Sequence, residues 1–246
     1  MLTKSSSITI NELTDRVVLT LDRPASRNAI TAEMIAELHD VCSLIEADPR
    51  PLLIHGAGDH FAGGADIGQL RDRRRDDALA GINRTLFDRI AALPLPTVAA
   101  VNGYALGGGA ELAYACDIRI ATPTARFGNP EPGLGILAAA GATYRLPDLV
   151  GGSVARQILL GARILTADDA HRHGLVAEVV AADDLLPAAH ALLDRIAASS
   201  PLALRMTKSA LASQSRQIVS EDIIQAVLFE TSDKQDRMTA FLERKK

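Results

Sequence analysis

The sequence predicts an α/β protein with a helical region at its C-terminal end, and three observations support this prediction. The chain has 246 residues, which is enough for one large core. Short β-prone apolar runs at residues 51–55, 97–101 and 117–121 are separated by segments that contain helix. Strands that alternate with helices are typical of an α/β sheet. After residue 140 the pattern becomes nearly all helical.

The first elements are expected to be a hairpin and a helix. Ile8 and Ile10 are spaced by two, and the β-prone run Val17–Leu21 follows them, which is the pattern of two paired strands. Apolar residues then recur with the helical period from Thr31 onward, until the Asp48-Pro49 pair stops the helix.

Capping signals place the helices of the C-terminal part. Thr166 is expected to cap a helix that Gly174 ends. Ser200 and Pro201 suit the N-cap and the first position of the next helix. The residues Ser220-Glu221-Asp222 are expected to open the last one.

Composition excludes several classes of protein. A net charge of −4 with 48% hydrophobic residues indicates a globular rather than a disordered chain. Five Phe, three Tyr and no Trp leave few stacking platforms, which argues against a nucleic-acid partner. No apolar run reaches the roughly 18 residues of a membrane span, and the N-terminus lacks the apolar stretch of a signal peptide. We therefore expect a cytoplasmic protein without a membrane partner.

The familiar cofactor and metal motifs are missing. Gly56-Ala-Gly58 follows a strand, but Phe61 stands where a dinucleotide fingerprint needs its third glycine. The sequence has no phosphate-loop motif, no GxSxG and no HExxH. Cys42 and Cys116 lack CxxC spacing and a paired histidine cluster, so we expect both to be buried small hydrophobes. No metal site is predicted.

One dense run of charges occurs at residues 71–77, where four arginines are interleaved with three aspartates. Because basic and acidic residues are interleaved, the run is expected to form a solvated loop or helix end. The alternative interpretation is a patch that contacts phosphate.

Two glycine-rich segments, residues 56–67 and 101–112, each follow a predicted strand. Glycine lets a backbone N–H approach a ligand closely, and a helix that opens after Gly109 would add the positive end of its dipole. Two such loops can supply two N–H donors to one oxygen, which is the composition of an oxyanion hole.

Two carboxylates accompany these loops. Glu111 lies at the start of the expected helix, and Glu131 lies in the turn-rich stretch 127–134. Each has apolar or glycine neighbours, and a carboxyl group in such surroundings tends to have the raised pKa that proton transfer near neutral pH requires.

Taken together, the chain resembles the enoyl-CoA hydratase/isomerase family, also called the crotonase family, over nearly its whole length. The most specific similarity is AVNGYALGGGAELA at residues 100–113. The other matching segments are LDRPASRNAI at 21–30, HGAG at 55–58, FAGGADI at 61–67, CDIRIA at 116–121, FGNPE at 127–131, ILTADDA at 164–170 and GLV at 174–176.

The resemblance implies a crotonase-like spiral of ββα units in residues 1–190 and a helical region for oligomerisation in residues 191–246. It implies a homotrimer or a dimer of trimers and an acyl-CoA thioester substrate, with no separate cofactor because coenzyme A is part of that substrate. The oxyanion donors fall on the backbone N–H groups of Ala65 and Gly108. The residues expected to bind coenzyme A are Gly63, Gly64, Ala65, Asp66, Ile67 and Gly68, with Arg27 at a phosphate and Phe241 and Lys245 at the nucleotide end.

The same resemblance assigns roles to the two glutamates, since both hydratase positions are Glu here. Glu111 would hold and deprotonate water for attack at C3, and Glu131 would deliver a proton to C2 of the enolate. The implied reaction is reversible syn hydration of a trans-2-enoyl-CoA to a 3-hydroxyacyl-CoA.

Residues 138–142 read Ala-Ala-Ala-Gly-Ala where hydratases of this family typically carry Pro-Gly-x-Gly-Gly. This departure leaves the acyl length and the reaction open. A Δ3,Δ2-enoyl-CoA isomerase with Glu131 as its single base is one alternative, and a noncatalytic acyl-CoA-binding paralogue is another. RNA binding is the weakest, because the net charge and the shortage of aromatics oppose it.

Overall fold

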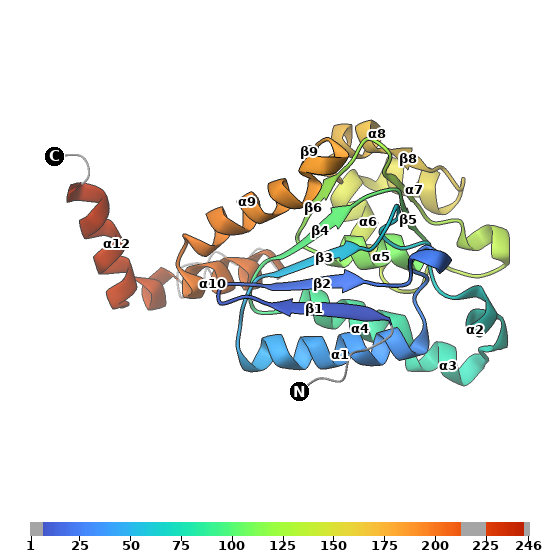
Figure 1. Ribbon diagram of the computed structural model, residues 1–246, viewed down its shortest axis with the longest axis horizontal. Coiled ribbons are helices and arrows are strands. Elements are labelled where there is room, and N and C mark those ends of the chain that lie inside the picture. The colour runs from blue at the N-terminus through green and yellow to red at the C-terminus, as the bar shows by residue number, and fades with distance from the viewer. Residues whose placement is uncertain (1–6, 213–224, 244–246) are drawn as a thin grey trace.

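The computed structural model describes residues 7–212 and 225–243, and the side chains of residues 235 and 240–242 are outside that description. Its central layer is a six-stranded sheet in the order β1-β2-β3-β4-β6-β9 (Figure 1). The strands are β1 (Ile8–Glu12), β2 (Val17–Leu21), β3 (Leu52–Gly56), β4 (Thr97–Val101), β6 (Ile118–Ala121) and β9 (Glu178–Val179). Only the β1–β2 hairpin is antiparallel, and the other neighbours in this sheet are parallel.

A second sheet of three short strands lies beside the first, in the order β5-β7-β8. Its strands are β5 (Tyr104–Leu106), β7 (Arg126–Gly128) and β8 (Leu165–Thr166). The sequence prediction missed this sheet, because strands of two or three residues carry no periodicity of their own. It also missed β9, which lies with β8 inside the part predicted to be nearly all helical.

Helices cover both faces of the large sheet. In chain order they are α1 (Ala32–Ala47), α2 (Ile67–Asp72), α3 (Arg75–Ala80), α4 (Ile82–Ala91), α5 (Gly108–Ala115), α6 (Ala142–Val150), α7 (Gly152–Leu159), α8 (Ala167–Arg172), α9 (Leu185–Ala197), α10 (Pro201–Ala212) and α12 (Ser232–Glu243). Three short 3-10 turns complete the set: η1 (Pro24–Ser26), η2 (Glu131–Leu134) and η3 (Ala182–Asp184). The α/β class, the hairpin and the first helix are as the sequence predicted.

The central strands are apolar on both faces because both faces are covered. All five residues of β4 are buried, as is usual for strands of a parallel sheet. On one face they contact α1, α4 and α5, and on the other they contact α9 through Leu185, Ala189 and Leu193. The boundary that the sequence placed at residue 190 therefore falls inside α9, whose two halves pack on the same sheet.

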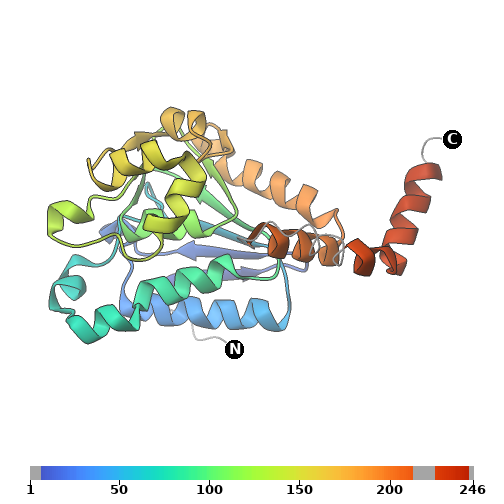
Figure 2. The same cartoon turned by 180° about the vertical axis from the view of Figure 1, so that it is seen from behind.

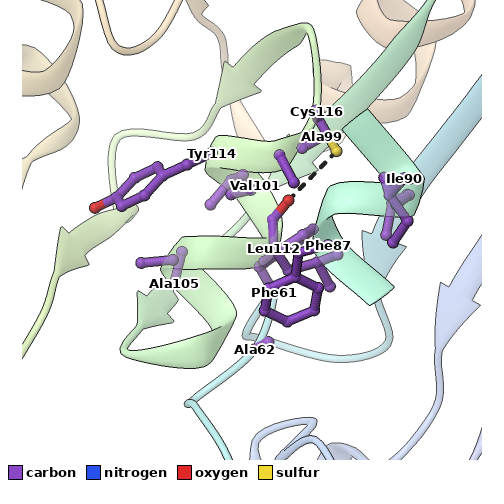
Figure 3. Packing of buried hydrophobic residues seen from close by; sticks show 14 of the residues in the cluster. Phe61, Ala62, Phe87, Ile90, Ala99, Val101, Ala105, Leu112, Tyr114 and Cys116 are labelled. Carbon is purple, nitrogen blue, oxygen red and sulfur yellow. Dashed lines mark hydrogen bonds between the residues drawn. The ribbon is translucent and has the colours of Figure 1, made fainter. Parts of the chain in front are cut away.

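The largest buried side chains gather where α4, α5 and the first glycine loop meet. Figure 3 shows Phe61, Phe87 and Leu112 lying together there, and all three are fully buried. In the same cluster the thiol of Cys116 donates a long hydrogen bond of 3.6 Å to the Leu112 carbonyl. Burial raises the pKa of Cys116 and of Cys42 to about 12, so both thiols stay protonated.

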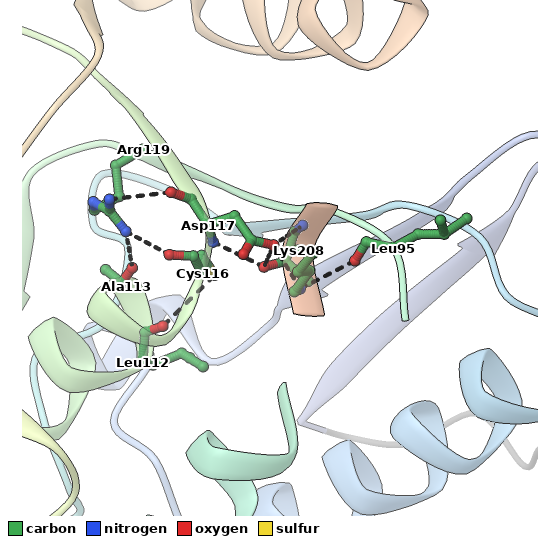
Figure 4. A network of polar contacts seen from close by, with 8 residues as sticks. Leu95, Leu112, Ala113, Cys116, Asp117, Arg119 and Lys208 are labelled. Atoms are coloured by element: carbon green, nitrogen blue, oxygen red, sulfur yellow. Dashed lines mark hydrogen bonds and ion pairs between the residues drawn. The ribbon is translucent and has the colours of Figure 1, made fainter. Parts of the chain in front are cut away.

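A buried arginine ties α5 to the sheet. The guanidinium of Arg119 donates to the carbonyl oxygen of Leu175 at 2.6 Å. It also donates to that of Ala113 at 3.1 Å (Figure 4). Next to it Lys208 of α10 pairs with Asp117 at 2.6 Å. This pair, together with the hydrogen bond from the Lys208 ammonium to the Leu95 carbonyl oxygen at 3.2 Å, fixes α10 to the core.

The last described helix lies away from the core. Both overall views show α12 standing away from the sheets (Figures 1 and 2). The guanidinium of Arg237 donates to the carbonyl oxygen of Ala198 at the end of α9, 2.7 Å away. Pro201 opens α10 as predicted, whereas the helix start expected at Ser220 lies outside the described residues.

Candidate active site

The second glycine loop leads directly into α5. Gly107 has a φ of +52°, which favours glycine, and the helix starts at Gly108, slightly earlier than the sequence predicted. Gly109 lies against the first loop so closely that a Cβ atom there would be 2.2 Å from the Ala62 carbonyl oxygen. The residue must therefore be glycine for the helix to dock. Docking brings Glu111, in the first turn of the helix, into the interior.

The first glycine loop is held by a buried amide. Asn28 accepts a hydrogen bond from the backbone N–H of Arg23 at 2.8 Å, and its amide donates to the carbonyl oxygens of Ala57 at 3.0 Å and His60 at 2.6 Å. The N–H of Ala62 donates to the backbone carbonyl oxygen of Tyr104 in β5, 2.9 Å away. Because loop and strand share these bonds, the segment that follows Ala62 runs alongside the start of α5.

Two backbone N–H groups meet where these segments converge. Within the described residues, neither the N–H of Ala65 nor that of Gly108 donates to a protein acceptor. They are close together, since a Cβ atom added to Gly108 would be 3.5 Å from the Ala65 nitrogen. Gly108 is also the first residue of α5, where the helix dipole favours negative charge. Together they can stabilise charge on one oxygen.

Glu111 is almost entirely buried, with 3% of its surface exposed. Its Oε1 accepts hydrogen bonds from the N–H groups of Ala140 at 2.7 Å and Ala142 at 3.1 Å. Burial raises the pKa of Glu111 to about 7, and the nearby Glu131 carboxyl adds to the rise. The two N–H bonds and the Arg145 cation oppose it. The group can therefore exchange a proton near neutral pH.

Glu131 begins the 3-10 turn η2, between Pro130 and Pro132. It is 7% exposed, and its buried Oε2 has no hydrogen-bond partner among the described residues. Burial raises the pKa of Glu131 as well, while the neighbouring Asn129 side chain lowers it. The Oδ1 of Asn129 itself accepts a hydrogen bond from the Tyr114 hydroxyl at 3.2 Å.

All four groups line one cavity of about 650 Å³. Ala65 and Gly108 contribute the backbone N–H groups, and Glu111 and Glu131 contribute the carboxyls. A volume of this size suits a small organic substrate. A thioester with its carbonyl at the two N–H groups would have two proton-exchanging carboxyls within the same cavity.

Comparison with known proteins agrees with this geometry. A family model described as enoyl-CoA hydratase/isomerase matches residues 15–246. The chain belongs to the enoyl-CoA hydratase/isomerase family. Crotonyl-CoA hydratase of Syntrophomonas wolfei is 40% identical over 93% of this chain and 92% of its own length. Short-chain-enoyl-CoA hydratase of Clostridium acetobutylicum is 38% identical with the same coverage.

Solved structures of the family show the same fold. Enoyl-CoA hydratase from Bacillus anthracis superposes with a TM-score of 0.91 at 30% identity, covering 97% of this chain and 96% of the other. The enoyl-CoA hydratase from Thermoplasma volcanium gives 0.90 at 33% identity, covering 98% and 99%. The predicted crotonase-like fold with its C-terminal helical region is thereby confirmed.

The residues that the family resemblance assigned to coenzyme A are scattered more widely than the four groups above. In residues 63–68 Ala65 lines the cavity, whereas Gly63, Ile67 and Gly68 are exposed and Gly64 is buried. Asp66 caps α2 by accepting from the N–H of Gln69 at 3.2 Å.

The other residues that the resemblance assigned to coenzyme A are Arg27, Phe241 and Lys245. Arg27 is exposed, with its guanidinium 5.5 Å from the centre of the Tyr104 ring. Phe241 lies in α12, but its side chain is not described, and Lys245 lies outside the described residues. In the described parts of the chain, no cluster of three His, Cys, Asp or Glu residues could hold a metal, and no helix has the length and apolar character to cross a membrane.

Sequence reasoning missed three contributors to the site. The N–H groups of Ala140 and Ala142 hold Glu111, and backbone donors leave no signal in composition or spacing. Arg145 lies next to them and donates to the Ala140 carbonyl oxygen at 3.3 Å. The charge run at 71–77 is exposed except for the half-buried Arg73, as predicted for a solvated helix end, and four of its residues also line the cavity.

Proposed function

We propose that this protein is an enoyl-CoA hydratase, which adds water reversibly to a trans-2-enoyl-CoA thioester and gives the 3-hydroxyacyl-CoA. One observation carries the proposal: two buried carboxyls with raised pKa values line the same cavity as two free backbone N–H groups. Relatives named crotonyl-CoA hydratase and short-chain-enoyl-CoA hydratase, at about 40% identity, support it.

The reaction begins with the thioester carbonyl oxygen at the N–H groups of Ala65 and Gly108. Ionised Glu111 takes a proton from water as the water oxygen forms its bond to C3. The electrons of the C2–C3 double bond move to the carbonyl oxygen, which becomes an enolate. Donors already in place for this negative charge lower the barrier, because no solvent has to reorganise.

Glu131 completes the addition. Its carboxyl, whose pKa is raised by burial, carries a proton in this step and gives it to C2 as the enolate collapses to the thioester. Glu111 is then protonated and Glu131 ionised, so in dehydration the two exchange roles. Syn addition requires both carboxyls to act on the same face of the double bond, and both line the same cavity.

Binding of the rest of the substrate is assigned by family resemblance. Residues 63–68 would follow the coenzyme A arm and Arg27 would contact a phosphate. Phe241 and Lys245 would close the nucleotide end from a neighbouring subunit. The reaction itself needs no further cofactor, because coenzyme A is part of the substrate. Residues 191–246 would assemble the chain into a homotrimer or a dimer of trimers.

The hydratase mechanism needs both glutamates, whereas a Δ3,Δ2-enoyl-CoA isomerase would need only Glu131. The two N–H bonds to Glu111 favour a working second carboxylate, because they stabilise its ionised form.

A spectrophotometric assay with crotonyl-CoA and longer 2-enoyl-CoAs tests the proposal. Glu111→Gln and Glu131→Gln should each lower kcat by at least about 100-fold, the lower range for general acid or base catalysis. Unchanged turnover in Glu111→Gln would exclude the hydratase mechanism. Turnover of 3-enoyl substrates alone, abolished only by Glu131→Gln, would establish the isomerase, and binding without turnover would establish the noncatalytic protein.

A further inference from the structure

The cavity that holds the two glutamates has a strongly basic wall. Asp77 is the only other acid among the described residues that line it. The chain as a whole carries a net charge of −4. Four cations in one cavity wall therefore create a local positive potential that differs in sign from the net charge. The cations are Arg73, Arg74, Arg75 and Arg84.

Two of these guanidinium groups have no carboxylate partner. Arg75 and Arg84 each form an exposed ion pair with an aspartate, at 2.9 and 3.3 Å. Arg73 instead donates to the neutral amide oxygen of Asn83 at 2.9 Å. The side chain of Arg74 has no ion-pair partner in the part of the chain that the structure describes. Arg73 and Arg74 are therefore the cations available to a ligand.

The rest of the cavity wall is largely apolar. Leu70, Ala78 and Ile82 contribute to it from α2, α3 and α4, and Ile136 and Leu137 contribute from the segment after η2. A hydrocarbon chain suits such a wall. One cavity therefore combines groups for a thioester, a lining for methylene groups and two unmatched guanidinium groups.

We propose that the preferred acyl chain of this enzyme ends in a carboxylate, which Arg73 and Arg74 bind. The planar guanidinium group matches a carboxylate with two parallel hydrogen bonds. This inference rests on the proposed hydration and names the substrate class of that same site.

Coenzyme A also carries anions, namely its phosphates. Of the residues assigned to the coenzyme A arm, only Ala65 lines this cavity. Arg73 and Arg74, which join α2 to α3, line it as well, and the resemblance assigns neither of them to coenzyme A. A carboxylate at the end of the acyl chain remains as the anion that the cavity itself would enclose.

Two substrates of equal length test the proposal: trans-2-hexenoyl-CoA and the same six-carbon 2-enoyl chain with a terminal carboxylate. The unchanged protein should have the higher kcat/KM for the carboxylate substrate. Arg74→Gln should lower that value about tenfold and leave the neutral substrate within about twofold, the size expected for one charged hydrogen bond. The preference should also decrease as salt is added. Arg71→Gln is the matched control, because Arg71 belongs to the same charge run, is 80% exposed and does not line the cavity.

The outcomes separate this inference from the hydratase assignment. If the unchanged protein hydrates neither substrate, the proposed function fails. If it hydrates the neutral substrate without preferring the carboxylate, only the inference is overturned. An equal loss on both substrates in Arg74→Gln would instead show that the arginine binds the phosphates of coenzyme A. Circular dichroism of each variant confirms that a loss is not caused by unfolding.

Discussion

Glu111 carries a carboxyl group that the fold keeps away from water. The folded protein raises its pKa from an ordinary 4.5 to about 7, so between these values the folded chain holds a proton that the unfolded chain has released. The stability of the protein therefore decreases as the pH rises through this window.

Glu111→Gln should raise the free energy of unfolding at about pH 8 by on the order of 3 kcal/mol, which is the equivalent of that pKa change. Near pH 4 the two proteins should be equally stable, because the carboxyl is then protonated in both states. Denaturant unfolding at the two pH values measures this. The exposed Glu178→Gln variant on β9 is the control. If Glu111→Gln changed the free energy of unfolding equally at both pH values, the raised pKa of Glu111 would be contradicted.

At the scale of elements, α4 and α6 are joined next to the site. Asp88 of α4 accepts hydrogen bonds from Tyr144 and Arg145 of α6, each at 2.6 Å. Arg145 also donates to the carbonyl oxygen of Ala140, the residue whose N–H holds Glu111. The ion pair thus helps to fix the residue whose N–H orients the carboxylate. This residue lies in the segment where alanines replace the Pro and two of the Gly residues typical of the family.

Arg145→Gln should lower kcat about tenfold with little change in KM, since a small misplacement of a catalytic group is costly. The Arg145 charge lowers the pKa of Glu111, so its removal should move the acidic limb of the kcat/KM profile to higher pH. Arg145→Lys should restore that limb. Arg89→Gln, which removes the ion pair between Arg89 of α4 and Glu46 of α1, should not move it. A change in KM alone would rule out a positioning role.

Elements were predictable from sequence where their own residues determine them. The strand at 97–101 and the helix that Thr31 caps are examples, because burial on one or two faces imposes the apolar pattern. The strand Tyr104–Leu106 was not predictable, since it exists only through pairing with β7. The same distinction holds in the site. Apolar neighbours indicate Glu111 and Glu131, but nothing in composition indicates that the backbone of Ala140 would hold a carboxylate.

At the scale of the whole molecule, the C-terminal helices present apolar side chains to solvent. Leu211 of α10 is 83% exposed, and Phe229 and Met238 are 47% and 51% exposed. Clusters of exposed apolar residues commonly mark a surface that another chain covers. This agrees with the proposed role of residues 191–246 in assembly.

Sedimentation of the full chain should give a particle of three or six subunits. Leu211→Asp should shift it toward smaller species, because a charge would be buried at the interface. Leu160→Asp is the matched control: Leu160 is 79% exposed at the end of α7, outside the C-terminal region. A full-length protein that sediments as a single subunit would refute the assembly.

The contact between Gly109 and Ala62 also limits how this enzyme can evolve. No side chain fits between the two segments, so point mutations cannot adjust the spacing of the Ala65 and Gly108 donors without separating α5 from the loop. New reactions in this lineage would have to arise from the carboxyls and the cavity wall instead. Ala139 and Ala140 belong to that wall, and they stand in the segment where the chain departs from the family pattern.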